Sequence, residues 1–278
     1  AYPRLNVGEV YNKGYEVELD YQAVVGQVSV GLNAQVGYAK NRIVENDEPD
    51  GLPDRDARKG KSVGQFIGYK TDGFYTSQAD IDASPKQQGF NPIPGDLKMR
   101  DLDGDGLITT LDQTSIGYTN NPEYVYSFTP RVAFKGFTLS VMFQGAANVS
   151  SNVILSEQNN GQQMYPFMLN AWTPENAATA TWPALHSRGT ASLNYALNDF
   201  TLQNAAYLKI RNVEIAYSLP KAWISKIGAR NASIFASGEN LALVGARKGL
   251  NVTGSFNGAV SNSYNFSRVI SLGFNVNF

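Results

Sequence analysis

The chain has 278 residues, with 23 Lys and Arg against 24 Asp and Glu, and it contains no cysteine. The nearly balanced charge gives no reason to expect a nucleic-acid partner, and the absence of cysteine excludes disulfides, thiol catalysis and Cys-ligated zinc. No apolar run is long enough for a membrane-spanning helix.

Alternation of apolar and polar residues predicts the first two strands. One covers residues 15–23 and the other residues 28–44, with a short turn at 25–27 between them. Both strands reach or exceed the roughly 9 to 11 residues that a tilted strand needs to cross a bilayer. The polar face of the first strand carries three acids that must face water or a wet lumen: Glu16, Glu18 and Asp20.

The alternation lapses over residues 46–122, where Gly, Pro and Asp recur. Irregular segments of this length are uncommon in compact domains and usually serve as functional loops. Within this one, residues 65–75 suggest a small hairpin. Residues 101–112 read DLDGDGLITTLD and carry the ligand spacing of an EF-hand calcium loop, with Gly106 at the sixth position. The predicted calcium ligands are Asp101, Asp103, Asp105, the carbonyl of Leu107, Thr109 and Asp112.

Two features of this acidic loop leave an alternative open. Asp112 stands where a Glu is usual, and no pair of amphipathic helices flanks the loop, so we expect an isolated loop rather than a paired EF-hand. Asp and Gly also favour ordinary turns. A solvated acidic turn is therefore the alternative to a calcium site.

A β-hairpin follows the acidic loop. Apolar residues fall on the even numbers of 124–134 and on the odd numbers of 137–143, and Lys135 with Gly136 forms the tight turn between the two strands. Pro130 lies inside the first strand, where its missing N–H removes a ladder hydrogen bond. We expect a local bulge at Pro130, or else the edge strand of an open sheet.

A second long irregular segment covers residues 148–205 and contains the only histidine, His186, which we expect to be an ordinary loop residue. Exposed aromatic residues in such loops bind sugars or partner proteins. The alternative is that they pack the loop onto the mouth of a barrel or lie in an aromatic girdle. The aromatic candidates for ligand or partner contact are Tyr165, Phe167, Trp172 and Trp182.

Three further strands complete the pattern. They cover residues 213–219, 234–244 and 270–278, and a slip of the alternation predicts a bulge at Arg211 and Asn212. Across all seven predicted strands, short connections alternate with long ones. Antiparallel strands give this alternation when tight turns lie on one side and large loops on the other, as in outer-membrane barrels.

Four segments of the chain resemble a known family. Residues 95–145 contain GDLKMRDLDGDGLI, a Tyr/Phe-rich strand, a KGF turn and a second strand that ends in FQG. The sequences at 6–19, 207–220 and 237–241 are NVGEVYNKGYEVEL, YLKIRNVEIAYSLP and SGENL. In this order the segments resemble the C-terminal part of SusC/RagA-type TonB-dependent outer-membrane transporters, and together they span most of the chain.

The resemblance implies an all-β fold, made of about seven C-terminal strands of a large antiparallel transmembrane β-barrel in the cell outer membrane. Residues 46–122 and 148–205 would be its long extracellular loops. The plug domain and the earlier barrel strands would precede this segment, which would then be a fragment, and TonB would act through that portion. The resemblance also gives Phe278 the place of the terminal aromatic residue by which such barrels are recognised for assembly.

The activity implied by the resemblance is uptake of glycans or peptides, together with a SusD-like surface lipoprotein and with outer-membrane lipid around the barrel. Bound calcium would stiffen the longest loop. An alternative from another class is a secreted, calcium-stabilised β-sandwich that binds carbohydrate. An enzyme has no credible catalytic set, because the GKSVG elbow at 60–64 lies in a polar loop and only one histidine is available as a base.

Overall fold

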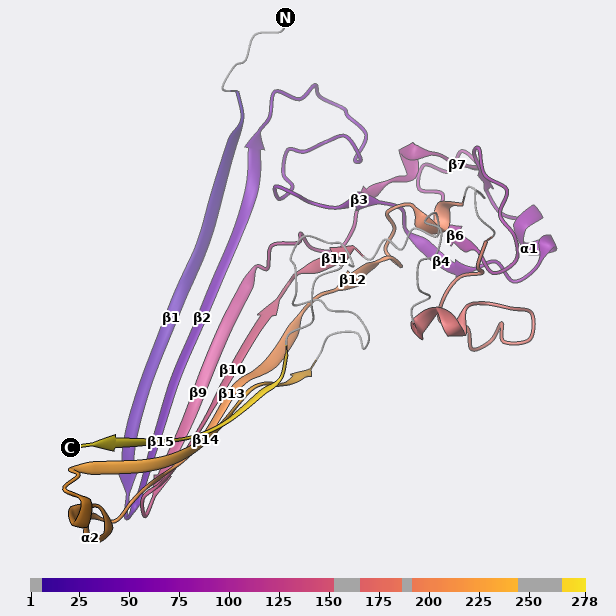
Figure 1. Ribbon diagram of the computed structural model, residues 1–278. Helices are drawn as coiled ribbons and strands as arrows, with labels where there is room; N and C mark the ends of the chain where they lie inside the picture. The colour runs from indigo at the N-terminus through magenta and orange to yellow at the C-terminus, as the bar shows by residue number, and fades with distance from the viewer. Residues whose placement is uncertain (1–6, 153–165, 187–191, 245–266) are drawn as a thin grey trace, which may run out of the picture.

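The computed structural model describes residues 7–152, 166–186, 192–244 and 267–278, and seven long antiparallel strands form its largest sheet (Figure 1). Each strand pairs with the next long strand along the chain, so the spatial order follows the sequence order. All seven predicted strands are confirmed. They are β1 (Glu9–Val25), β2 (Val28–Glu45), β9 (Tyr124–Phe134), β10 (Phe137–Ala147), β13 (Tyr207–Ser218), β14 (Asn231–Val244) and β15 (Val269–Asn277).

The strand register gathers polar side chains on one face of this sheet. Glu18 lies beside Gln35, Gln35 lies beside Ser127, and Ser127 lies beside Gln144. Because side chains alternate between the two faces along a strand, these four residues share one face, which we call the polar face. They also line a cavity of about 720 Å³ that extends from β1 to β10.

The opposite face is apolar, and we call it the outer face. Val17 lies beside Val36, and Val36 lies beside Tyr126. On β15, Leu272 and Phe274 of this face are 81% and 76% exposed. A contiguous apolar surface of this kind marks contact with a membrane or another protein. Its exposure argues against the β-sandwich alternative, which would bury the apolar face.

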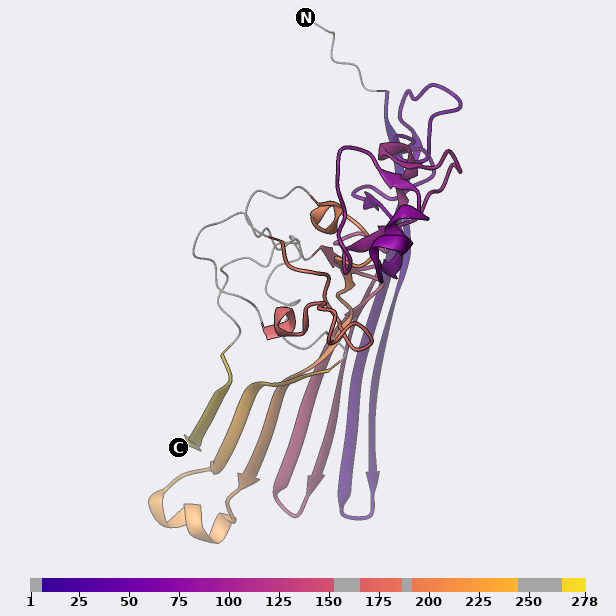
Figure 2. The same ribbon diagram turned by 90° about the vertical axis from the view of Figure 1, so that its right-hand side faces the viewer.

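Short connections join the strands at one end of the sheet, and the long loops lie at the other end (Figures 1 and 2). Lys135 and Gly136 have φ angles of 47° and 86°, as a two-residue type I′ hairpin requires. The connection from β13 to β14 carries a short helix, α2 (Lys221–Ile224), and the 3-10 turn η4 (Ser225–Ile227). The connection from β14 to β15 covers residues 245–268, and its residues 245–266 lie outside the described part of the chain.

The sheet has one predicted irregularity and lacks another. The register of β13 shifts at Arg211 in its pairing with β10 and also in its pairing with β14, which confirms the bulge in β13. The bulge expected at Pro130 is wrong, because β2 pairs with β9 in one continuous register that includes Leu32 opposite Pro130. On the other side of β9, the pairing with β10 is interrupted between Phe128 and Arg131 without a shift. The missing N–H of Pro130 is thus accompanied by a local loss of pairing with β10 and not by a bulge.

The two long loops fold into short elements. The hairpin predicted over residues 65–75 is wrong, because its two strands pair elsewhere: β3 pairs with β8, and β4 pairs with β6. The first loop contains β3 (Ile67–Gly68), β4 (Thr71–Phe74), α1 (Gln78–Asp82), β5 (Lys86–Gln87), β6 (Leu97–Met99), β7 (Leu107–Ile108), η1 (Thr110–Asp112) and β8 (Thr114–Ser115). The second contains β11 (Ser150–Asn152), η2 (Pro166–Asn170), η3 (Leu193–Tyr195) and β12 (Leu202–Asn204).

The described parts of these two loops pack together, and we call them the loop module. Phe200 of the second loop packs against a buried cluster around Trp182 and also against a cluster that contains Leu97 of the first loop. A backbone hydrogen bond of 2.8 Å from the N–H of Ala184 to the carbonyl of Gly95 joins the loops as well. Segments far apart in the sequence therefore share one core above the end of the sheet.

Candidate functional site

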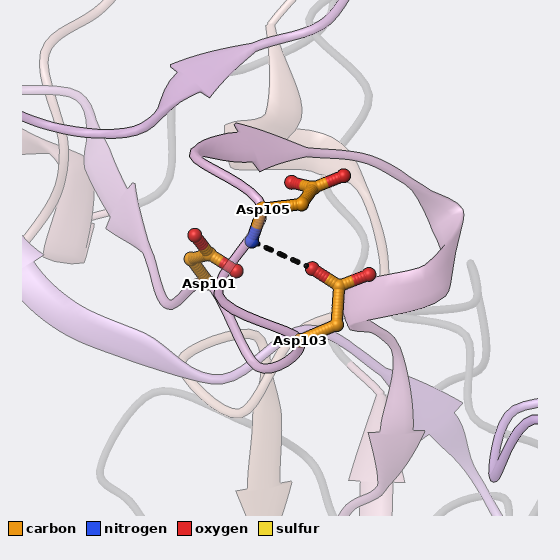
Figure 3. A group of neighbouring side chains, drawn as sticks. All are labelled: Asp101, Asp103 and Asp105. Atoms are coloured by element: carbon orange, nitrogen blue, oxygen red, sulfur yellow. Dashed lines mark hydrogen bonds between the residues drawn. The ribbon is translucent and has the colours of Figure 1, made fainter.

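The predicted calcium loop lies in the loop module, where it follows β6 and includes β7 and η1. Asp101, Asp103 and Asp105 come together there, and each offers a carboxylate oxygen that lies within 4.8 Å of the other two (Figure 3). Asp103 and Asp105 are exposed, and Asp101 is half-buried. Alternate residues of a tight turn have thus placed three oxygens around one point, as the sequence spacing predicts.

Backbone donors give this turn its shape. Both oxygens of Asp101 accept hydrogen bonds, from the N–H of Gly104 at 2.6 Å and from the N–H of Gly106 at 2.9 Å. Oδ1 of Asp105 accepts from the N–H of Leu107 at 2.7 Å. Gly104 and Gly106 have φ angles of 78° and 83°, a left-handed conformation that favours glycine. The two glycines therefore allow the acids to converge.

The charges of the cluster affect one another. The N–H of Gly106 holds the pKa of the Asp101 carboxyl below its ordinary value. The N–H of Asp105 lowers the pKa of Asp103 too, but desolvation and the charges of Asp105, Asp112 and Asp101 outweigh that bond and leave the pKa raised. Like charges held close together repel, so a cation among them would relieve the repulsion.

The last two predicted ligands close the loop. The side chain of Asp112 is fully buried, and its two oxygens accept from the N–H of Leu102 at 2.8 Å and the N–H of Thr109 at 2.7 Å. The hydroxyl of Thr109 accepts from the N–H of Leu111 at 3.0 Å and caps η1. Asp112 and Thr109 thus form a capping box that holds the ends of the acidic turn together.

The aromatic candidates have different surroundings. Trp182 is only 4% exposed and its ring lies 5.5 Å from that of Phe200, which supports the packing role that the sequence left open. Trp172 is half-buried, with its ring close to Gly95. Phe167 lies in η2, and Tyr165 lies outside the described residues.

His186 is a structural residue that the sequence did not reveal. Its Nε2 lies 2.5 Å from Oδ1 of Asp96, and both side chains are at least 97% buried. Asp96 also accepts from Nδ2 of Asn194 at 2.7 Å and from the N–H of Ile93 at 2.9 Å. Asn194 in turn accepts from the N–H of Leu97 at 2.8 Å. Buried polar groups thus join the two loops, contrary to the expectation of an ordinary loop histidine.

Comparisons with known proteins identify relatives of this chain. No protein-family model matches the chain. It is 28% identical to TonB-dependent receptor P26 of Formosa agariphila over 98% of this chain, and 26% identical to TonB-dependent receptor P3 of the same organism over 85%. It is 21% identical to TonB-dependent receptor SusC of Bacteroides thetaiotaomicron over 88%. The chain spans only 24% to 30% of the length of these relatives.

Solved structures share the fold. The chain aligns with the RagAB peptide transporter at a TM-score of 0.71 and 19% identity, covering 97% of this chain and 29% of that one. The open-open state of the RagAB peptide importer aligns at a TM-score of 0.70. No helix in the described ranges is long and apolar enough to span a membrane. By sequence over most of its length the chain is similar to one section of TonB-dependent receptors, SusC among them, and it shares the fold of that section of the RagAB transporter.

Proposed function

We propose that this chain forms barrel wall and extracellular loops of a TonB-dependent outer-membrane transporter that imports glycans or peptides. The outer face contacts lipid, the polar face lines the lumen, and the loop module lies outside the cell. TonB acts through the plug and the remaining barrel, and a SusD-like surface lipoprotein closes the loop end. The observation that carries this proposal is the antiparallel sheet with one polar and one apolar face, found in a relative of TonB-dependent receptors.

Aromatic side chains near both ends of the outer face support the membrane placement. Towards the loop end, ring centroids of Tyr15 and Tyr38 lie 5.4 Å apart, and those of Tyr38 and Tyr124 lie 4.6 Å apart. At the short-turn end, the rings of Phe137 and Tyr217 lie 4.4 Å apart. About ten residues of a strand tilted by roughly 45° separate the two groups, which gives a band about 24 Å tall. Outer-membrane barrels have an apolar band of about 25 Å between aromatic girdles.

Copurification tests the proposed transporter and its partner. We expect the full-length protein, solubilised in detergent from outer membranes of its native source, to carry a surface lipoprotein that mass spectrometry identifies. A partner held by a protein interface should remain at high salt and be lost when the loop module is deleted. A soluble, solitary protein in the same preparation would contradict the proposal.

We further propose that the acidic loop binds calcium. Calcium takes oxygen ligands at 2.3–2.6 Å, so two ligands on opposite sides of the ion lie about 5 Å apart. The carboxylate separations of up to 4.8 Å among Asp101, Asp103 and Asp105 fit this geometry. Each carboxylate oxygen of Asp112 accepts one hydrogen bond. A carboxylate has about four lone-pair sites, so Asp112 in the capping box keeps lone pairs that could bind a metal ion. The ion would stiffen the loop where substrate or the lipoprotein approaches.

Calcium should therefore protect the acidic loop from proteolysis. Extracellular sites bind with dissociation constants of about 10⁻⁴ to 10⁻³ M, so 10 mM calcium should stabilise the closed loop by about 1.4 to 2.7 kcal/mol. We expect roughly 10- to 100-fold slower cleavage within residues 101–112 of the full-length protein. Asp103→Ala with Asp105→Ala should abolish the effect, and Asp50→Ala, at an exposed acid elsewhere in the loop, should leave it intact. Equal cleavage with calcium and with chelator would contradict the metal site.

A further inference from the structure

The connection between β13 and β14 folds back onto the outer face of the sheet. Ile224 of α2 is only 4% exposed, and it belongs to a buried cluster with Ala229 and Ala232, against which Leu219 and Val276 pack. Ala232 lies opposite Val276 in the ladder. Because Val276 is two residues from Phe274 on β15, it shares the outer face. The short helix is therefore anchored on the apolar side of the sheet, at the short-turn end.

The exposed side of this connection combines a tryptophan with basic residues. Trp223 precedes the buried Ile224 and is 64% exposed. Lys221 and Lys226 are exposed on α2 and η4, and Arg230 is exposed just before β14. Residues 219–231 contain no Asp or Glu. A half-buried segment thus presents one large amphipathic ring and several positive charges.

The same charge bias holds for the whole short-turn end. The connections between β1 and β2, β9 and β10, and β13 and β14 contain four basic residues and no acidic ones. The first long loop, residues 46–122, contains thirteen acids against eight bases. The short connections and the first long loop therefore differ in the sign of their charge. The positive charge of the short connections suits a negatively charged partner.

We propose that residues 219–230 bind anionic phospholipid at the short-turn end of the barrel wall, an inference that rests on the membrane placement proposed above. The ring of Trp223 lies among the headgroups, where amphipathic aromatic side chains concentrate at membrane interfaces. Lys221 and Lys226 extend along the same surface and pair with lipid phosphates. Lipid fits better than a protein partner because the anchor of the segment, Ile224, lies on the face that continues into the lipid-facing surface.

Membrane depth tests the position of Trp223. Spin labels at Trp223→Cys, Val141→Cys and Gln88→Cys would be introduced one at a time into a cysteine-free, full-length transporter in vesicles of phosphatidylethanolamine and phosphatidylglycerol. We expect the label at position 141 to lie deep in the bilayer, the label at 223 at the interface, and the label at 88 in water. A label in water at 223, with 141 in lipid, overturns this inference alone. A label in water at 141 overturns the membrane placement and this inference with it.

Lipid retention tests the role of the lysines. Anionic lipid attracts each nearby Lys by about 1 kcal/mol, or roughly fivefold in affinity. Lys221→Gln with Lys226→Gln should therefore weaken phosphatidylglycerol binding to the detergent-purified full-length protein by about 25-fold, measured by native mass spectrometry. Lys86→Gln, which removes an exposed lysine from the loop module, is the matched control and should have no effect. Equal phosphatidylglycerol binding by the double variant and the unmodified protein would overturn the proposal.

Discussion

Val141→Arg is expected to destabilise the folded full-length protein in lipid vesicles by about 2 to 4 kcal/mol, the cost of an arginine near the bilayer midplane on the lipid face of a barrel. Val141 lies beside Val213 on the outer face, midway along β10. The penalty arises because a guanidinium in hydrocarbon loses its hydration without gaining a partner. Urea unfolding in vesicles, followed by tryptophan fluorescence, measures the change.

Ser140→Arg provides the matched control on the neighbouring residue. Ser140 lies on the polar face, with Arg131 on one side and Glu214 on the other. A new arginine there meets one like and one opposite charge in a wet lumen. We therefore expect the free energy of unfolding to change by no more than about 0.5 kcal/mol. Equal penalties at positions 140 and 141 would contradict the assignment of the two faces.

Asp96→Ala is expected to destabilise the packing of the two long loops against each other in the loop module. Asp96 is buried and bonds to His186, Asn194 and the backbone of Ile93, so its removal leaves several buried polar groups without their partner. Removing one member of such a buried network costs about 3 to 5 kcal/mol. Because the network joins both loops, backbone protection from hydrogen exchange should fall together in residues 93–100 and 193–199 of the full-length protein.

The long strands should remain protected in this variant, because they are held by their own ladder and not by the loops. Asp96→Asn keeps the shape of the side chain but removes its charge, and it should cause a smaller loss of hydrogen-exchange protection in the same two segments. Asp50→Ala changes an exposed acid of the same loop and should change nothing. Loss of protection confined to residues 93–100 would contradict the role of Asp96 in joining the two loops.

The long strands were predictable because each exposes two chemically different faces. The alternation in β9 and β15 reflects one wet and one apolar surface, and the slip at Arg211 located a bulge that the register confirms. The bulge predicted at Pro130 is wrong, because a strand can lose hydrogen bonds to one neighbouring strand while its pairing with the other keeps the register. Periodicity thus gives the faces of a strand but not the hydrogen bonds of each rung.

The interior of the loop module was not predictable in the same way. Its strands are mostly two or three residues long, too short to show a period. Their packing depends on pairs that are distant in sequence, such as Asp96 with His186 and the bridge from Tyr69 to Asn198. The three acids of the turn were predictable because they are close in sequence, whereas the capping role of Asp112 required the structure.

Labelling of introduced cysteines on intact cells tests the central claim most directly. Gln88 is exposed in the loop module, and Gln27 is exposed in the tight turn at the opposite end of the sheet. A membrane-impermeant maleimide should label Gln88→Cys on intact cells, and Gln27→Cys only after the outer membrane has been permeabilised. Labelling of both positions on intact cells, or of Gln88→Cys only after permeabilisation, would contradict a sheet that spans the outer membrane with its loop module outside.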